Sequence, residues 1–264
     1  RDKLVTGVQT CALPICALLS SSLALAENIV VGATPVPHAE ILEAITPELK
    51  AQGYDLVIKE FNDYVLPNKA LDEKDLDANF MQHEPYLREF NANNGTKINA
   101  VASVHLEPMG AYSTKIKNIN ELANGAKIAI PNDPTNESRA LDVLASAGLI
   151  KLNENVKLRT PIDIIDNPKK LVFVELEGAT LPRALSEVDL AVINSNFALN
   201  ANLNPLNDAL IIENAQNNPY SNILAVRAGD ENTAKTTALK NAITSQKAKD
   251  FIKQKYQGAV IPSF

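Results

Sequence analysis

Short apolar runs alternate with amphipathic segments along most of the chain, and this alternation is the strongest constraint on its fold. Residues 29–32 form an apolar run that predicts a buried strand, and apolar side chains recur at helical spacing over residues 38–52. Further strands are expected at residues 55–61, 99–106, 126–130, 171–175, 188–193 and 223–227. Further helices are expected at residues 66–71, 84–91, 119–122, 136–147, 181–185 and 234–254. Strands that alternate with helices predict α/β layers with largely parallel sheets.

The length of the chain allows two arrangements of these elements. It has 264 residues, and those after the first 26 suffice for one doubly wound sheet or for two lobes of about 110 residues each. Hydrophobic periodicity alone leaves both arrangements open.

Composition excludes several classes of protein. A hydrophobic fraction of 45% argues against intrinsic disorder, and the chain lacks the several long apolar runs of a polytopic membrane protein. The net charge of −6 and the absence of Lys/Arg clusters argue against nucleic acid as a partner.

The N-terminal segment predicts export from the cytoplasm. We expect residues 1–26 to be the remnant of a signal peptide, because residues 17–26 are small and apolar and end in Ala-Leu-Ala. Residues 5–15 resemble translated adapter sequence and are expected to be non-native, so residues 1–16 carry no weight in the fold assignment. An alternative is a lipobox that ends at Cys16, although Ile15 stands where a small residue is needed. Both cysteines precede residue 17, so the rest of the chain has no disulfide framework.

Motifs for common cofactors and nucleophiles are absent from the sequence. It contains no Gly-x-Gly-x-x-Gly, P-loop, His-Glu-x-x-His or Gly-x-Ser-x-Gly pattern. The histidines His38, His83 and His105 have no second His or Cys at metal-ligand spacing. We therefore expect no cofactor, no metal and no catalytic residue.

The segment at residues 131–141 is the best candidate for an anion site. It follows a buried strand and leads into a helix, so that backbone N–H groups near Asn136 and the guanidinium of Arg139 can converge on one carboxylate. The alternative is that Asn132 and Asp133 only shape a turn while Arg139 makes a surface ion pair.

Two further sets of residues are candidates for a binding site. Phe80, Met81, His83 and Tyr86 lie within seven residues, with Tyr64 upstream, and aromatic rings make favourable contacts with a thioether. These residues could equally be ordinary core aromatics.

Amide side chains also stand at two strand ends. Asn194 follows one predicted strand and Asn222 precedes another, and an amide supplies both a donor and an acceptor for a zwitterion. As isolated residues they could equally be turn formers.

Together these segments resemble the methionine-binding lipoprotein family of NlpA type, the substrate-binding subunits of ATP-driven methionine importers. The resemblance extends from about residue 28 to residue 264. Its most specific blocks are residues 63–71, 77–87, 105–115, 131–141, 163–169 and 191–194.

The resemblance implies a periplasmic-binding-protein-like α/β fold with a ligand cleft between two lobes. Lobe one would hold residues 27–111 and 222–264, and lobe two residues 112–221. The family's residues imply that the ligand side chain is wrapped by Tyr64, Phe80, His83 and Tyr86. They also imply that Arg139 holds the carboxylate with help from Asn136, and that Asn194 and Asn222 hold the amino-acid head group.

The implied function is capture of methionine or a close relative and delivery to an ABC importer permease with its ATPase. The protein would act as a monomer in the periplasm or cell envelope, with contact to the membrane only through a lipid anchor. L- or D-methionine, a methionyl dipeptide or another amino acid all remain open as the ligand. The competing interpretation is an enzyme on the same scaffold that uses His83 with Glu84 or Glu107 as acid and base.

Overall fold

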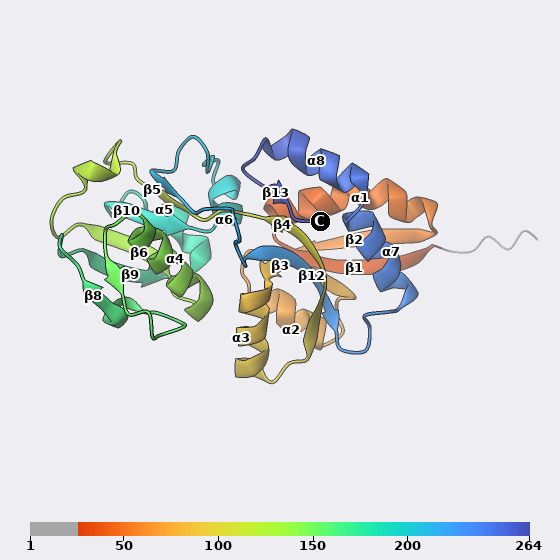
Figure 1. Ribbon diagram of the computed structural model, residues 1–264. Helices are drawn as coiled ribbons and strands as arrows, with labels where there is room; N and C mark the ends of the chain where they lie inside the picture. Colours follow the sequence, from red (N-terminus) through yellow and green to blue (C-terminus); the bar gives the residue numbers. More distant parts are fainter. Residues whose placement is uncertain (1–25) are drawn as a thin grey trace, which may run out of the picture.

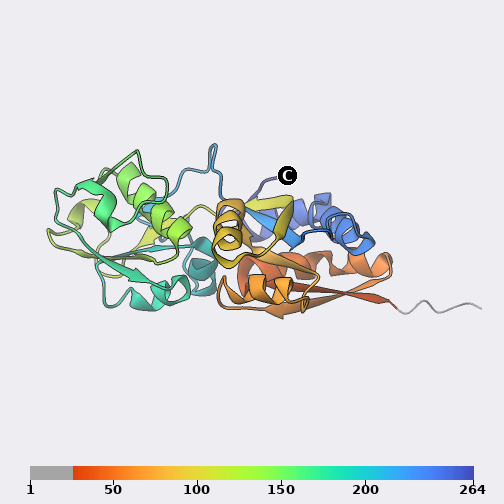
Figure 2. The ribbon, with the colours of Figure 1, turned by 90° about the horizontal axis from the view of Figure 1, so that it is seen from below.

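The computed structural model describes residues 26–264, so the predicted signal peptide and Cys16 lie outside the described residues, apart from residue 26. Figures 1 and 2 show two lobes side by side, joined by chain segments that cross between them. The first lobe contains a six-stranded sheet in the order β13-β4-β12-β3-β1-β2. Its strands are β1(Glu27–Ala33), β2(Tyr54–Glu60), β3(Ala78–His83), β4(Ile98–Leu106), β12(Ser221–Arg227) and β13(Ile261–Pro262).

Helices cover both faces of this sheet, because its strands are apolar on both sides. The short turn η1(Pro35–Ala39) leads into α1(Glu40–Ala51), which packs with α7(Ala234–Ile243) and α8(Gln246–Tyr256) on one face. The other face is covered by α2(Leu66–Asp72) and α3(Glu84–Asn94). Figure 1 shows these two groups on opposite sides of the sheet.

The second lobe contains a five-stranded sheet in the order β11-β5-β10-β6-β9. Its strands are β5(Gly110–Tyr112), β6(Lys127–Pro131), β9(Val172–Leu176), β10(Leu190–Ile193) and β11(Ile211–Ile212). Helix α4(Pro134–Ser146) packs on one face, and α5(Leu181–Ala184) with α6(Ser195–Asn200) on the other. A two-stranded ribbon, β7(Lys151–Leu152) with β8(Ile164–Asp166), completes this lobe. Strand β5 spans the lobe boundary expected between residues 111 and 112.

The prediction of largely parallel sheets is wrong for the strands next to the crossovers. Strand β12 is antiparallel to both β3 and β4, and β5 is antiparallel to both β10 and β11. The chain leaves the first lobe through β4 and returns through β12, so neighbouring strands on this path run in opposite directions. Only pairs away from the crossovers, such as β1 with β2 and β6 with β9, are parallel.

Two local predictions also differ from the structure. The expected C-terminal helix at residues 234–254 is two helices, because Ser245 begins α8 by accepting a hydrogen bond from the Ala248 N–H. Strand β3, which the sequence analysis did not predict, carries a bulge: Gln82 pairs with Ile223 and Phe80 with Leu224, which leaves Met81 between them without a cross-strand partner.

Over residues 26–264, every helix is too short or too polar to cross a membrane.

Candidate functional site

A buried polar pocket lies where the two lobes meet the crossover segments. Its cavity volume in this arrangement of the lobes is about 20 Å³, room for about one water molecule, so a larger ligand requires the lobes to move apart. Its lining residues come from both lobes: Tyr64, Met81, Gln82, His83, Tyr86, Glu107, Asn136, Arg139, Asn194, Ser195, Asn196 and Asn222. Seven of the eight predicted binding residues are among them, and Phe80 is not.

Two helix starts position side chains at the pocket. His83 ends β3 and begins α3, where its Nδ1 accepts a hydrogen bond from the Tyr86 N–H at 3.1 Å. Asp133 begins α4 in the same way, accepting from the Asn136 N–H at 3.0 Å. Each helix therefore begins at the junction of the lobes, with its first turns facing the other lobe.

Arg139, in the second turn of α4, is buried and already paired with protein groups along one edge. Its Nε and Nη2 donate to the two carboxylate oxygens of Glu213 at 2.8 and 2.6 Å, and Nη2 also donates to the Glu107 carbonyl at 2.8 Å. The guanidinium carbon lies 4.3 Å from the ring centre of Tyr220. The Nη1 amino group has no hydrogen-bond partner within residues 26–264, so it remains available to a ligand anion.

Asn136 has its amide fully used within the protein. Its Nδ2 donates to both carboxylate oxygens of Asp133 at 3.0 Å, and its Oδ1 accepts from Asn194 Nδ2 at 2.8 Å. The same Oδ1 lies 3.1 Å from His83 Nε2. Because His83 Nδ1 accepts the Tyr86 N–H, Nε2 carries the proton and donates across the lobes to Asn136. Burial and the nearby Arg139 lower the pKa of His83 to about 3, so this imidazole is neutral.

Asn222 presents the donor side of its amide to the pocket. Its Oδ1 lies 3.0 Å from Nε2 of His38, whose Nδ1 lies 2.7 Å from the Thr34 hydroxyl. This leaves the Asn222 NH₂ group for a ligand. Asn194 has the opposite polarity: its Nδ2 donates to Asn136, and its buried Oδ1 has no partner in the described part of the chain.

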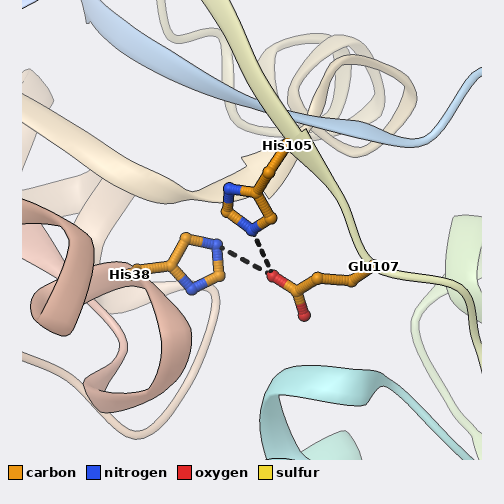
Figure 3. Close-up of side chains that lie close together, drawn as sticks. All are labelled: His38, His105 and Glu107. Carbon is orange, nitrogen blue, oxygen red and sulfur yellow. Dashed lines mark hydrogen bonds and ion pairs between the residues drawn. The ribbon is translucent and has the colours of Figure 1, made fainter. Parts of the chain in front are cut away.

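Among the described residues that line the pocket, Glu107 is the one carboxylate, and two imidazoles lie against it. Its Oε1 lies 2.6 Å from His105 Nε2 and 3.3 Å from His38 Nε2 (Figure 3). Burial raises the pKa of Glu107, and it lowers the pKa of His38 to about 4 and that of His105 to about 3. The sequence analysis considered Glu107 only as a catalytic group and did not predict it to bind a ligand.

Aromatic rings form the apolar wall of the pocket. Tyr64 and Tyr86 meet edge to face with ring centres 5.7 Å apart, and Met81 lies nearby on β3. The Tyr64 hydroxyl donates to Asn196 Oδ1 at 2.6 Å, a second hydrogen bond between the lobes. Phe80 instead lies in the core of lobe one, where its ring packs against those of His38 and His105.

The structure brings together residues that could in principle hold a metal ion. His38, His105 and Glu107 place their ligand atoms within 4.8 Å of one another, although these residues are far apart in sequence. Tetrahedral zinc separates its ligand atoms by about 3.3 Å, whereas His105 and Glu107 are 2.6 Å apart. Moreover, His105 Nδ1 is buried without a partner, whereas metal-bound histidines normally donate this second N–H. The geometry fits a hydrogen-bonded cluster.

The acid–base pair considered for an enzyme is not assembled here. Glu84 is 55% exposed and pairs with Arg88 one turn further along α3, outside the pocket. His83 uses both ring nitrogens in hydrogen bonds to protein groups.

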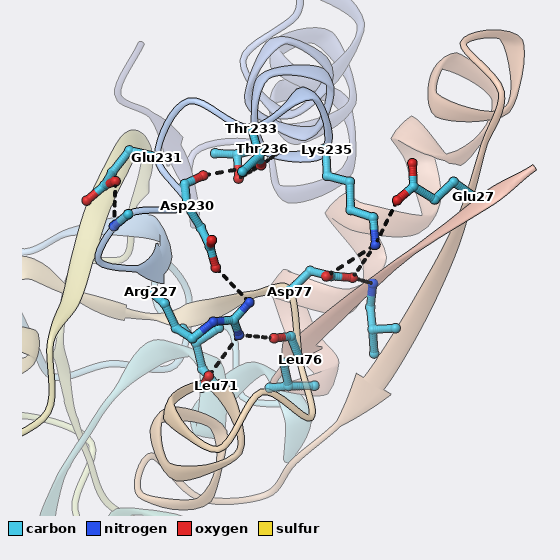
Figure 4. Close-up of polar contacts among 12 residues, drawn as sticks. Glu27, Leu71, Leu76, Asp77, Arg227, Asp230, Glu231, Thr233, Lys235 and Thr236 are labelled. Atoms are coloured by element: carbon cyan, nitrogen blue, oxygen red, sulfur yellow. Dashed lines mark hydrogen bonds and ion pairs between the residues drawn. The ribbon is translucent and has the colours of Figure 1, made fainter.

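A second polar cluster lies at the far end of lobe one and consists of groups paired with one another (Figure 4). Arg227 donates to the carbonyls of Leu71 and Leu76 and pairs with Asp230 at 2.7 Å. Lys235 pairs with Asp77 at 3.3 Å. These bonds connect α2, the loop before β3, β12 and α7, so this cluster stabilises the lobe.

Replacing Arg227 with alanine should therefore affect stability and not binding. The variant leaves two carbonyls without their donor, and we expect the free energy of unfolding to fall by about 1–3 kcal/mol. Urea denaturation measures this loss, and calorimetry should give the wild-type affinity for ligand. An altered affinity would contradict the assignment of this cluster to stability alone.

Two α/β lobes, two crossover segments and a buried polar pocket between them define a two-lobed substrate-binding protein. The NlpA lipoprotein family model matches residues 29–264, and the chain belongs to this family.

Relatives support this assignment. The methionine-binding lipoprotein MetQ of Bacillus subtilis is 44% identical over 241 residues, which cover 89% of this chain and 88% of the relative. A nutrient-binding protein from Burkholderia cenocepacia, solved with bound methionine, is 44% identical with a TM-score of 0.87, covering 89% of this chain and 100% of that one. A periplasmic substrate-binding protein of an ABC transporter from Coxiella burnetii is 41% identical with a TM-score of 0.85, at 89% and 100% coverage.

Proposed function

We propose that this protein binds methionine, or an amino acid close to it, between its lobes and delivers it to an ABC importer. Its family is one of substrate-binding proteins, and relatives of similar length are named for methionine binding or for an ABC transporter. We also propose that it acts outside the cytoplasmic membrane with a lipid anchor, since its relatives are named lipoproteins. We propose that it acts as a monomer, since a single chain supplies all the residues that line the pocket.

The proposal depends on two hydrogen-bond donor groups at the pocket that have no acceptor among the described residues. Arg139 Nη1 and the Asn222 amide have their other positions satisfied by protein groups, so both are held in place for a carboxylate. A buried anion needs such partners because desolvation costs several kcal/mol. The rings of Tyr64 and Tyr86 and the thioether of Met81 then offer an apolar surface to the ligand side chain.

Contacts between the lobes explain how binding would be signalled. The His83–Asn136 and Tyr64–Asn196 hydrogen bonds join lobe one to lobe two in the closed form. A ligand that touches both lobes binds the closed form more tightly than the open one and shifts the population towards closure. The permease would recognise the closed shape.

Ligand-dependent stabilisation tests the proposed function. After unfolding and refolding to remove retained ligand, methionine at about 100 times its Kd should stabilise the protein by about 2.7 kcal/mol, a rise of roughly 5–10 °C in Tm. Methioninol, which lacks the carboxylate, is the matched control and should give a much smaller rise. No rise with either enantiomer of methionine would contradict the proposal, and mass spectrometry of ligand released on unfolding would then identify the true ligand.

A further inference from the structure

Three buried amide side chains hydrogen-bond to one another between α2 and β3. Asn68 and Asn79 are 0% exposed, and Gln82 is 3% exposed. Asn68 Nδ2 donates to Gln82 Oε1 at 2.8 Å, and Asn68 Oδ1 accepts from Asn79 Nδ2 and from Gln82 Nε2, both at 2.7 Å. Gln82 Nε2 also donates to Asn79 Oδ1 at 2.9 Å. Every amide nitrogen and oxygen of these three residues, the amide triad, therefore has a partner within the triad.

The amide triad requires the bulge in β3. Asn79 and Gln82 are three residues apart, and in a regular strand two such residues lie on opposite faces of the sheet. Here Gln82 pairs with Ile223 and Asn79 with Ala225, and both of these partners belong to the core cluster beneath α2 and α3. Cross-strand partners share a face, so Asn79 and Gln82 both face α2. The extra residue in the bulge, Met81, brings them to this common face.

A regular register of β3 would break the amide triad. Without the bulge, Met81 would pair with Ile223, and Gln82 would turn to the opposite face of the sheet, towards α1. Asn68 would then lose its bonds to Gln82. Buried amide groups without partners cost more free energy than their hydrogen bonds contribute, so this register is disfavoured.

The bulge also decides where Met81 lies. Met81 is 2% exposed and lines the pocket, whereas Asn68 and Asn79 are not among its lining residues. In the regular register Met81 would share a face with Ile223, within the core beneath α2. Asn68 and Asn79 can therefore change the pocket through the register of β3, although they lie outside it.

We propose that Asn68, Asn79 and Gln82 are positioning residues that lock the bulged register of β3 and thereby hold Met81 at the pocket wall. Bulges next to binding sites re-aim a side chain, and a fully satisfied network of buried amides specifies one arrangement of the core. The register does not depend on a ligand. The inference rests on the proposed function only where methionine binding is the readout.

NMR spectroscopy of the ligand-free protein tests the register directly. Cross-strand backbone contacts should show Gln82 paired with Ile223 in the wild type. Asn68→Ala removes the residue that bonds to both other amides, and a large share of its molecules should instead pair Met81 with Ile223.

A matched control on the same helix separates register from stability. Leu71 is also 0% exposed on α2, and Leu71→Ala destabilises lobe one without removing an amide, so it should keep the wild-type register. Asn79→Ala keeps the bonds between Asn68 and Gln82 and is the milder variant if Asn68→Ala does not fold; it should shift the register to a smaller extent. If the Asn variants keep the wild-type pairing of Gln82, the proposed lock is wrong.

Calorimetry with methionine tests the consequence for the pocket. Asn68→Ala should weaken binding about tenfold, the loss we expect for Met81→Ala, because both changes remove the contact with the Met81 thioether. The double variant Asn68→Ala/Met81→Ala should also weaken binding about tenfold, since the same contact cannot be lost twice. Leu71→Ala should bind methionine within about threefold of the wild-type affinity, because it leaves that contact in place.

The double variant also provides the result that would overturn the proposal. A loss of about 100-fold in Asn68→Ala/Met81→Ala would show that the two residues act independently, and Asn68 would then not act through Met81. A wild-type protein that fails to bind methionine would contradict the proposed function instead, and the NMR comparison would still decide whether the amide triad sets the register.

Discussion

Arg139→Ala should abolish methionine binding, with a loss of affinity of at least about 100-fold. The substitution removes the one pocket cation from the described residues and leaves the ligand carboxylate buried without its charge-assisted hydrogen bonds, which are worth about 2–5 kcal/mol. Calorimetry with refolded, ligand-free protein measures the change. Methioninol, which has no carboxylate, should bind wild type and variant with similar weak affinity.

The control for Arg139 is another arginine that pairs with α4. Arg159 donates to Asp142 at 2.8 Å and lies outside the pocket, so Arg159→Ala should keep the wild-type affinity. Arg139→Ala also leaves Glu213 without its partner, and some loss of stability is expected. Binding is therefore measured well below the Tm, with circular dichroism showing a folded protein. An affinity for methionine within threefold of the wild-type value would show that Arg139 does not bind the ligand carboxylate.

Phe80→Ala should have a large effect on stability and a small one on binding. The Phe80 ring is fully buried in the core of lobe one, with its centre 4.6 Å from that of the His38 ring and 5.2 Å from that of His105. Deleting such a ring leaves a cavity and costs about 3–5 kcal/mol. Urea denaturation measures this loss, and the affinity of the folded variant for methionine should fall by less than about fivefold.

Met81 is the matched comparison, because it is the next residue on β3 and lines the pocket. Met81→Ala should weaken methionine binding by about tenfold, through lost apolar contact of roughly 1.5 kcal/mol. Phe80→Leu, which keeps most of the volume, should restore much of the stability lost in Phe80→Ala. If Phe80→Ala weakened binding more than Met81→Ala, the placement of these two side chains would be wrong.

Local sequence patterns predicted the alternating elements well, and long-range pairing explains the errors. Residues 29–32 and 188–193 are apolar runs, and both are central strands. The antiparallel pairing of β12 with β3 and β4 depends on where the chain crosses between lobes, and no local pattern encodes that path. The short polar-ended strand β3 was missed because it contains Asn79, Gln82 and His83, which are unusual in a buried strand.

Residue type and helix position together predicted which side chains of α4 lie at the pocket. Asn136 and Arg139 lie in the first two turns of a helix that follows a buried strand, and the structure places both at the pocket. Phe80, which was expected to wrap the ligand side chain, is not among the described residues that line the pocket, and the side on which a strand residue lies depends on its register, which the bulge at Met81 alters. Glu107 was not predicted to line a binding pocket, because its partners His38 and His105 meet it only in the folded chain. The sequence marked Glu107 only as a single glutamate just after a predicted strand.

A crystal structure of the protein with bound L-methionine tests the central claim most directly. The account predicts one methionine between the lobes, with its carboxylate within hydrogen-bond distance of Arg139 Nη1 and the Asn222 amide. Its thioether should lie against Tyr64, Tyr86 and Met81. Methionine bound elsewhere, or bound here with its carboxylate and ammonium groups exchanged, would contradict the account.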